Sequence, residues 1–176
     1  MKSPIEYLQN LMGKSGTDLW RNANGIDGSP VIPYRKQKSI PTENTFQTDT
    51  IDLNFLNAEL TRITESIAYE LRSQNKLTGC VTVKIRYTDF QTYTKQRSIS
   101  FTNADCLLLK EVKSLFNYER CQLIRLIGVR FTQLIPGCHQ IDLFRDTRED
   151  IALYQAIDSV KKRFGESLLM NAGGIG

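Results

Sequence analysis

The longest regular pattern of apolar residues lies between Asp49 and Gln74. Leucine and isoleucine recur there every three or four residues, at Leu56, Leu60, Ile63, Ile67 and Leu71. This spacing places them on one side of a helix, so it predicts a long amphipathic helix that covers a hydrophobic core. A second run with the same period predicts a C-terminal helix that ends at Gly165. Its apolar residues are Ile151, Tyr154, Ile157, Val160 and Phe164.

Residues 81–88, VTVKIRYT, alternate strictly between two classes of side chain. The alternation predicts a half-buried strand with Val81, Val83, Ile85 and Tyr87 inside and Thr82, Lys84, Arg86 and Thr88 outside. Gly79 is expected to be a break before this strand. After a turn near 89–91, residues 92–101 are the expected hairpin partner. Thr102 and Asp105 then provide caps for a further helix with Leu108, Val112, Leu115 and Phe116 on its buried side.

The segment 121–131, CQLIRLIGVRF, reads as a buried strand, and a final strand is expected around 140–144. The order from 49 to 144 is therefore α-β-β-α-β-β, with an edge strand possible at 39–46. The economical layering is an α+β domain, in which two long helices cover one face of a four-stranded antiparallel sheet.

Two arginines interrupt the apolar segment 121–131. Arg125 and Arg130 are five residues apart, so in a regular strand they would point to opposite faces, and an unpaired charge in the core is costly. Glycine inside a strand often marks a bulge. A bulge or sharp twist at Gly128 would put Ile124, Leu126, Val129 and Phe131 inside and Arg125, Arg130 and Thr132 outside.

The outer face of the predicted sheet would then be basic. It would carry Lys84, Arg86, Arg125 and Arg130, with Lys95 and Arg97 nearby; Ile99 and Phe101 share the parity of the last two, which leaves their face ambiguous. Acidic residues gather instead on the first long helix, at Asp49, Asp52, Glu59, Glu65 and Glu70. A basic face with hydroxyl donors suits a phosphate backbone and reads bases little. The plain alternative is a solvated charged surface.

Before the sheet, two short helices are expected, over about 3–12 and 17–24, ending at Gly13 and Gly25. The segment GSPVIPYRKQKSIP follows as an extended basic linker that contains Arg35, Lys36 and Lys38.

Composition narrows the function classes only slightly. The 176 residues carry a formal net charge of +4, so an anionic partner must be argued from where the charge lies. Four scattered cysteines and one histidine do not have the spacing of a metal site. The sequence shows no signal peptide and no membrane-spanning stretch, so we expect a cytoplasmic protein with reduced thiols and no membrane partner.

Several stretches resemble the C-terminal part of Y-family translesion DNA polymerases of the DNA polymerase IV (DinB) type. They are LMGKSGTDLWRNANGID with SPV, the KSI linker, IRLIGVRFTQLI and AIDSVKKRFG. The resemblance implies the end of a thumb domain at 1–31, a linker at 32–43, a little-finger DNA-binding domain at 44–144, and a C-terminal helix and tail at 145–176.

In that family the little finger grips primer-template duplex DNA by its backbone. The resemblance implies DNA contacts at Arg125 and Arg130 and at the linker residues Lys36, Lys38 and Ser39. Contacts at Lys84, Arg86, Lys95 and Arg97 rest on the strand parity. The family's two-metal chemistry uses Mg²⁺ held by palm-domain carboxylates, and this segment has no matching motif, so no catalytic residue, cofactor or small-molecule ligand is expected within it.

The segment Gln140, Ile141, Asp142, Leu143 and Phe144 resembles the QLxLF peptide that docks bacterial polymerases on the sliding clamp, with Ile in place of the usual Leu. It also fits a final strand, and both roles can coexist. A rival from another class is a non-enzymatic, ferredoxin-like interaction module whose basic face meets an acidic protein.

Overall fold

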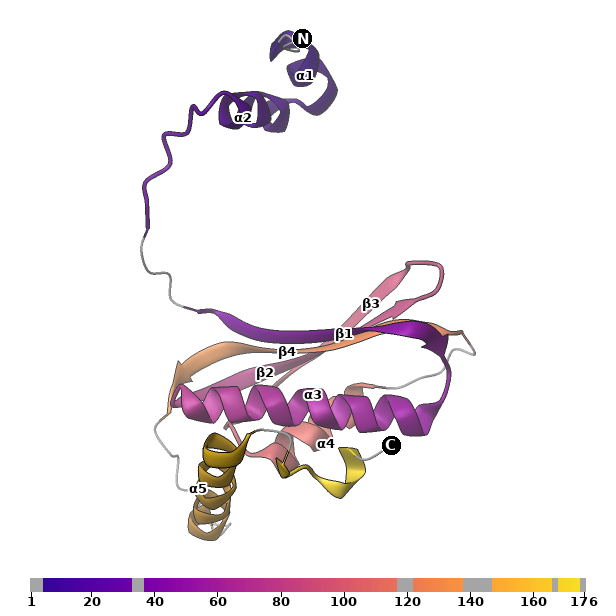
Figure 1. Cartoon of the computed structure of the whole chain (residues 1–176), viewed down its shortest axis with the longest axis vertical. Helices are drawn as coiled ribbons and strands as arrows, with labels where there is room; N and C mark the ends of the chain where they lie inside the picture. Colours follow the sequence, from indigo (N-terminus) through magenta and orange to yellow (C-terminus); the bar gives the residue numbers. More distant parts are fainter. Residues whose placement is uncertain (1–4, 33–36, 117–121, 138–146, 166–167, 175–176) are drawn as a thin grey trace. The chain divides into compact units, whose positions relative to one another are not determined.

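The computed structural model describes residues 5–32, 37–116, 122–137, 147–165 and 168–174. The chain forms two compact units, Met1–Lys36 and Gln37–Gly176 (Figure 1). The predicted division into thumb end, linker and little finger stays a prediction.

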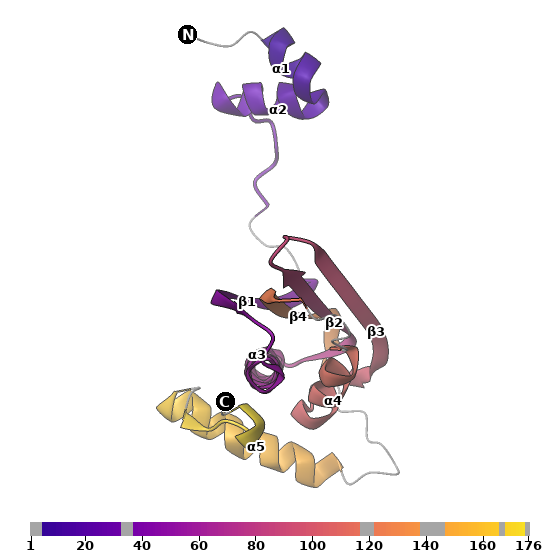
Figure 2. The same ribbon diagram turned by 90° about the vertical axis from the view of Figure 1, so that its right-hand side faces the viewer.

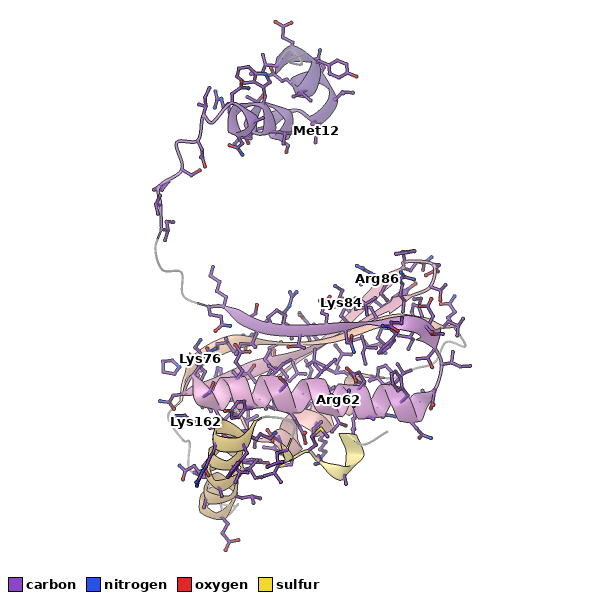
Figure 3. The ribbon with its side chains drawn as sticks, in the orientation of Figure 1. Met12, Arg62, Lys76, Lys84, Arg86 and Lys162 are labelled. Atoms are coloured by element: carbon purple, nitrogen blue, oxygen red, sulfur yellow. The ribbon has the colours of Figure 1, made fainter. Side chains whose placement is uncertain are left out.

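The first unit is a pair of short helices, α1 (Ile5–Met12) and α2 (Lys14–Ala23). They pack closely because Gly16 has no side chain, and a Cβ there would lie 2.0 Å from the carbonyl oxygen of Leu8. Both predicted helices are confirmed, although α2 begins three residues earlier than expected. The apolar side chains Tyr7, Leu11 and Leu19 are exposed, as is Met12, labelled in Figure 3.

The second unit contains the predicted α+β sheet. Its elements in chain order are β1 (Ser39–Thr50), α3 (Leu53–Ser73), β2 (Lys76–Tyr87), β3 (Thr92–Thr102), α4 (Asp105–Leu115), β4 (Ile124–Pro136), α5 (Thr147–Phe164) and the short η2 (Ala172–Gly174). The four strands pair antiparallel in the order β1-β4-β2-β3. Helices α3 and α4 lie on the same side of this sheet (Figure 2), which confirms the predicted fold class.

Three boundaries differ from the expectation. Strand β2 begins at Lys76 and passes through Gly79, so the predicted break there is wrong. The edge strand β1 exists and runs on to Thr50, and it begins inside the expected linker. Strand β4 continues to Pro136. The final strand expected at 140–144 lies outside the described residues.

The core forms between the sheet and the helices. Strand β2 contributes Val81, Val83 and Ile85, and β4 contributes Ile127, Val129 and Phe131, all almost fully buried. The facing apolar stripe of α3 is the predicted one, at Leu56, Leu60, Ile63, Ile67 and Leu71. Asp52 starts this helix, because its carboxylate accepts hydrogen bonds from the backbone amides of Asn54 (2.9 Å) and Phe55 (3.3 Å).

Helix α5 makes a third layer on the far side of α3, as the end-on view of α3 in Figure 2 shows. Arg72 of α3 holds it there with a two-pronged ion pair to Asp158, Nε to Oδ2 at 2.7 Å and Nη2 to Oδ1 at 2.9 Å. The same guanidinium reaches α4 through the carboxylate of Asp105 and stacks over the Tyr154 ring, 4.8 Å from its centroid. Arg72 therefore joins three helices.

The tail after α5 covers the acidic side of α3. The backbone amide of Asn171 donates to the carboxylate of Glu65 (3.1 Å), and Gly174 is buried against Ala58 and Thr61. Burial raises the pKa of Glu65, an effect that the Asn171 amide and nearby Lys161 only partly oppose. The acidic side of α3 that the sequence predicts is therefore partly buried.

We expect Arg72→Ala to destabilise the protein strongly, because it leaves Asp105 and Asp158 without their partner in a mostly buried site. Arg72 exposes only 9% of its side chain. Breaking such a buried pair costs about 3 to 5 kcal/mol. Urea unfolding measures the loss. Arg62→Ala is the matched control: it removes an ion pair to Glu59 whose arginine exposes 55% of its side chain, and should cost at most about 1 kcal/mol. Equal losses would refute the role of Arg72.

Glu65→Gln should stabilise the protein at neutral pH, because glutamine still accepts from Asn171 and burial no longer opposes a charge. The raised pKa of Glu65 means that the folded state binds this proton more tightly than the unfolded state. The native protein therefore has this contribution in full below the unfolded pKa and loses it as the pH rises through the folded pKa. Thermal melts should show the largest advantage of the variant at pH 7 and a shrinking one toward pH 4. A constant difference would contradict the prediction.

Candidate nucleic-acid interface

The face of the sheet turned away from the helices is defined by the strand register. Residues directly opposite each other in paired strands share a face. The partners of the buried residues Val81, Val83 and Ile85 therefore point toward the helices, and the intervening residues point outward. We call the outward set the outer face: Ser39, Pro41, Glu43 and Thr45 of β1, Leu126, Gly128, Arg130 and Thr132 of β4, Thr82, Lys84 and Arg86 of β2, and Thr92, Thr94 and Gln96 of β3.

The bulge in β4 lies at Arg125, so the prediction of a bulge at Gly128 is wrong. The β2–β4 register continues without a shift past Gly128, pairs Arg86 with Leu126, and then pairs Tyr87 with Ile124. Arg125 is the extra residue. As a consequence Ile127, and not Leu126, shares the core side with Ile124.

Gly128 serves a different purpose. It lies between Glu43 of β1 and Lys84 of β2 in one row across the sheet. The Glu43 side chain passes over it, since a Cβ on Gly128 would be 2.6 Å from the Glu43 Cγ. Both carboxylate oxygens of Glu43 accept from the Lys84 ammonium, at 3.0 and 2.9 Å. Glycine in the central strand thus makes room for an ion pair between its two neighbours.

Two arginines flank this pair on the outer face. Arg130 is exposed, and its neighbours across the strands are Pro41 and Thr82, neither of which carries a charge. Arg86 donates from Nε to the Thr92 hydroxyl at 2.9 Å. Figure 3 labels Lys84 and Arg86 on the side of the sheet away from α3. The structure therefore brings together three of the predicted cations, Lys84, Arg86 and Arg130.

Arg125 lies at the end of the sheet rather than within the outer face. Its guanidinium is 3.8 Å from the carboxylate of Asp49 and stacks 4.9 Å from the centroid of the Phe90 ring. Phe90 is 65% exposed and has a left-handed backbone with φ 63° in the turn between β2 and β3. The hydrophobic pattern does not indicate Phe90, because turn geometry is not visible in it.

The two cations of β3 lie on the other side of the sheet. Lys95 is opposite Val83 and Arg97 is opposite Val81, so both belong to the helix side of this edge strand. Arg97 donates to Glu111 (2.9 Å) and Ser114 (3.2 Å) of α4. The structure thus resolves their ambiguous parity and separates them from the outer face.

At the start of β1, Lys38 is exposed and Ser39 lies opposite Thr132 on the outer face. Lys36 and the segment from Gln140 to Phe144 lie outside the described residues. That segment falls between the end of β4 at Pro136 and the start of α5 at Thr147.

In the described ranges, no three His, Cys, Asp or Glu side chains come close enough to hold a metal ion. The helices seen in those ranges include none with the length and apolar character required to cross a bilayer.

Comparison with known proteins identifies several relatives that are all named DNA polymerase IV. DNA polymerase IV of Clostridium acetobutylicum is 30% identical over 97% of this chain and 45% of its own length. DNA polymerase IV of Methanoculleus marisnigri is 36% identical over 76% of this chain and 38% of its own length. The chain spans less than half the length of these curated relatives.

Among solved structures, the complex of the beta-clamp processivity factor and the little finger domain of PolIV matches with a TM-score of 0.46 and 20% identity, over 61% of this chain and 99% of the other. The model of the impB/mucB/samB family C-terminal domain matches residues 37–143. This match covers more than half of the chain and nearly all of the sheet unit as far as α5, so the chain belongs to the impB/mucB/samB family.

Proposed function

We propose that the second unit grips primer-template duplex DNA for an error-prone, Y-family translesion polymerase of the DNA polymerase IV type. The observation that carries the proposal is the outer face, which the helices leave uncovered. It gathers Lys84, Arg86 and Arg130 among threonine and serine hydroxyls. Family membership supports the same assignment.

The grip would act through phosphates. Cations supply long-range attraction, while hydroxyl groups fix the position of the backbone oxygens without reading the bases. Lys38 at the start of β1 and Arg125 at the sheet end extend the basic surface beyond the outer face. In this proposal the segment provides binding only, and Mg²⁺-dependent phosphoryl transfer belongs to the palm carboxylates of the polymerase.

Docking on a bacterial sliding clamp is the second part of the proposal, and it rests on residues 140–144. Leu143 and Phe144 would fill an apolar cleft while Gln140 orients the extended peptide. The peptide lies between β4 and α5 in the sequence, so both of its ends continue into elements of the same compact unit. The same compact unit, Gln37–Gly176, would therefore make both the clamp contact and the DNA contact.

Arg130→Ala should weaken binding to duplex DNA, because it removes an exposed cation from the middle of the outer face. Three to five phosphate contacts predict a slope of log affinity against log salt of about −3 to −4.5, and the variant should be shallower by about 0.9. Fluorescence anisotropy across a salt series measures both. Arg97→Ala removes the same charge from the helix side, where Glu111 already pairs with it, and should change little.

The rival function predicts a different outcome. A shallow salt dependence, with both variants binding DNA like the native chain while an acidic protein is captured tightly, would favour the protein-interaction module over the DNA grip.

Replacing Leu143 and Phe144 together by alanine should reduce clamp affinity at least about tenfold, since buried apolar anchors dominate such interfaces. Surface plasmon resonance on immobilised clamp measures the loss. DNA affinity should not change, and His139→Ala, just outside the peptide, should bind the clamp normally. Full clamp binding by the double variant would move the docking site elsewhere.

A further inference from the structure

We propose that Glu43 limits the strength of the DNA grip by occupying Lys84, an inference that rests on the proposed function of the outer face. Glu43 is the one carboxylate among the outward residues that the described strand pairs define. It belongs to the edge strand β1, and its carboxylate reaches across β4 to Lys84 of β2 on the face that would meet phosphates.

The pair is built into the sheet. Glu43, Gly128 and Lys84 form one row, and only a residue without a side chain at position 128 lets the Glu43 chain cross the central strand. Both Glu43 oxygens lie within 3.0 Å of the Lys84 nitrogen. Lys84, which would point toward a bound DNA backbone, is therefore already paired with a negative charge.

The carboxylate also acts on its neighbours. Arg130 lies in the next row on one side of the pair and Arg86 in the next row on the other. Arg130 is a diagonal neighbour of Glu43 on the adjacent strand β4, and such positions are about 7 to 8 Å apart, within one Debye length at ordinary salt, so Glu43 lowers the positive potential around Arg130. A phosphate that approaches the row meets an ammonium group already paired with a carboxylate.

The pair remains open to competition. Lys84 and Glu43 expose 26% and 32% of their side chains, and partly exposed ion pairs are weak. A phosphate oxygen can displace the carboxylate from Lys84. The cost of breaking the Glu43–Lys84 pair then offsets part of the attraction between Lys84 and the phosphate. Glu43 thereby keeps the affinity below what the same cations would give alone.

The test is Glu43→Gln in the 176-residue chain, measured by anisotropy with duplex DNA across a salt series. Glutamine keeps the length of the side chain over Gly128, and urea unfolding confirms that the fold is intact. We expect binding about 3- to 10-fold tighter near 0.1 M salt, and a salt slope steeper by about 0.9 because one more counterion is released.

The matched control is Glu111→Gln. It makes the same change in net charge and also frees an arginine, Arg97, but on the helix side of the sheet. It should tighten binding much less. In a Lys84→Gln background, Glu43→Gln should no longer steepen the slope, because the ammonium that it would release is absent.

The outcomes separate this inference from the proposed function. If Glu43→Gln binds like the native chain or like Glu111→Gln while Arg130→Ala is weakened, the DNA grip stands and the role of Glu43 is refuted. Weaker binding by Glu43→Gln would also refute it. If Arg130→Ala binds normally as well, the proposed function itself fails.

Discussion

Apolar side chains at alternate positions of β2 and β4 pack against α3 and α4. Because only one face of the sheet is buried in this way, the packing constrains the rest of the second unit. Each fully buried Val or Ile contributes about 1.5 to 3 kcal/mol, whereas an exposed ion pair contributes at most about 1 kcal/mol. The core therefore decides which face each strand turns inward. Lys84 and Arg86 point outward because Val83 and Ile85 point inward.

The same constraint shows why the sequence predicts the elements better than the details of the face. The period of α3 and the alternation of β2 lie within single segments, and both are confirmed. In β4 an extra residue anywhere between Ile124 and Arg130 would reconcile the two arginines with a buried strand. Gly128 was the natural candidate, but its small size serves Glu43 and Lys84 on neighbouring strands. Its role depends on how β4 pairs with β1 and β2, and the sequence of β4 alone does not show this pairing.

The period of apolar residues predicts the helix α5 but not the contacts that dock it on α3. Arg72 pairs with Asp158, which is 86 residues away along the chain, and Glu65 accepts a hydrogen bond from Asn171, which is 106 residues away. In the helical pattern both residues look like members of a solvated face. Contacts between residues so far apart in the sequence depend on where α5 and the tail pack against α3, and no local sequence pattern encodes that position. They cover the helices and leave the outer face free, so the C-terminal segment adds stability without blocking the proposed grip.

The presence of a carboxylate on the proposed DNA-binding face is easier to understand when the proposed clamp contact is considered with it. In the proposed function, two contacts hold the polymerase at a primer end, and linked contacts multiply their effects through a high effective concentration. A grip made as strong as its cations allow would then hold the enzyme long after a lesion is passed. If Glu43 restrains Lys84, the sheet gives orientation and a modest, salt-sensitive affinity, while residence depends on the clamp peptide. In that case the loss of either contact would speed release, because the multiplying effect of the linkage is then lost.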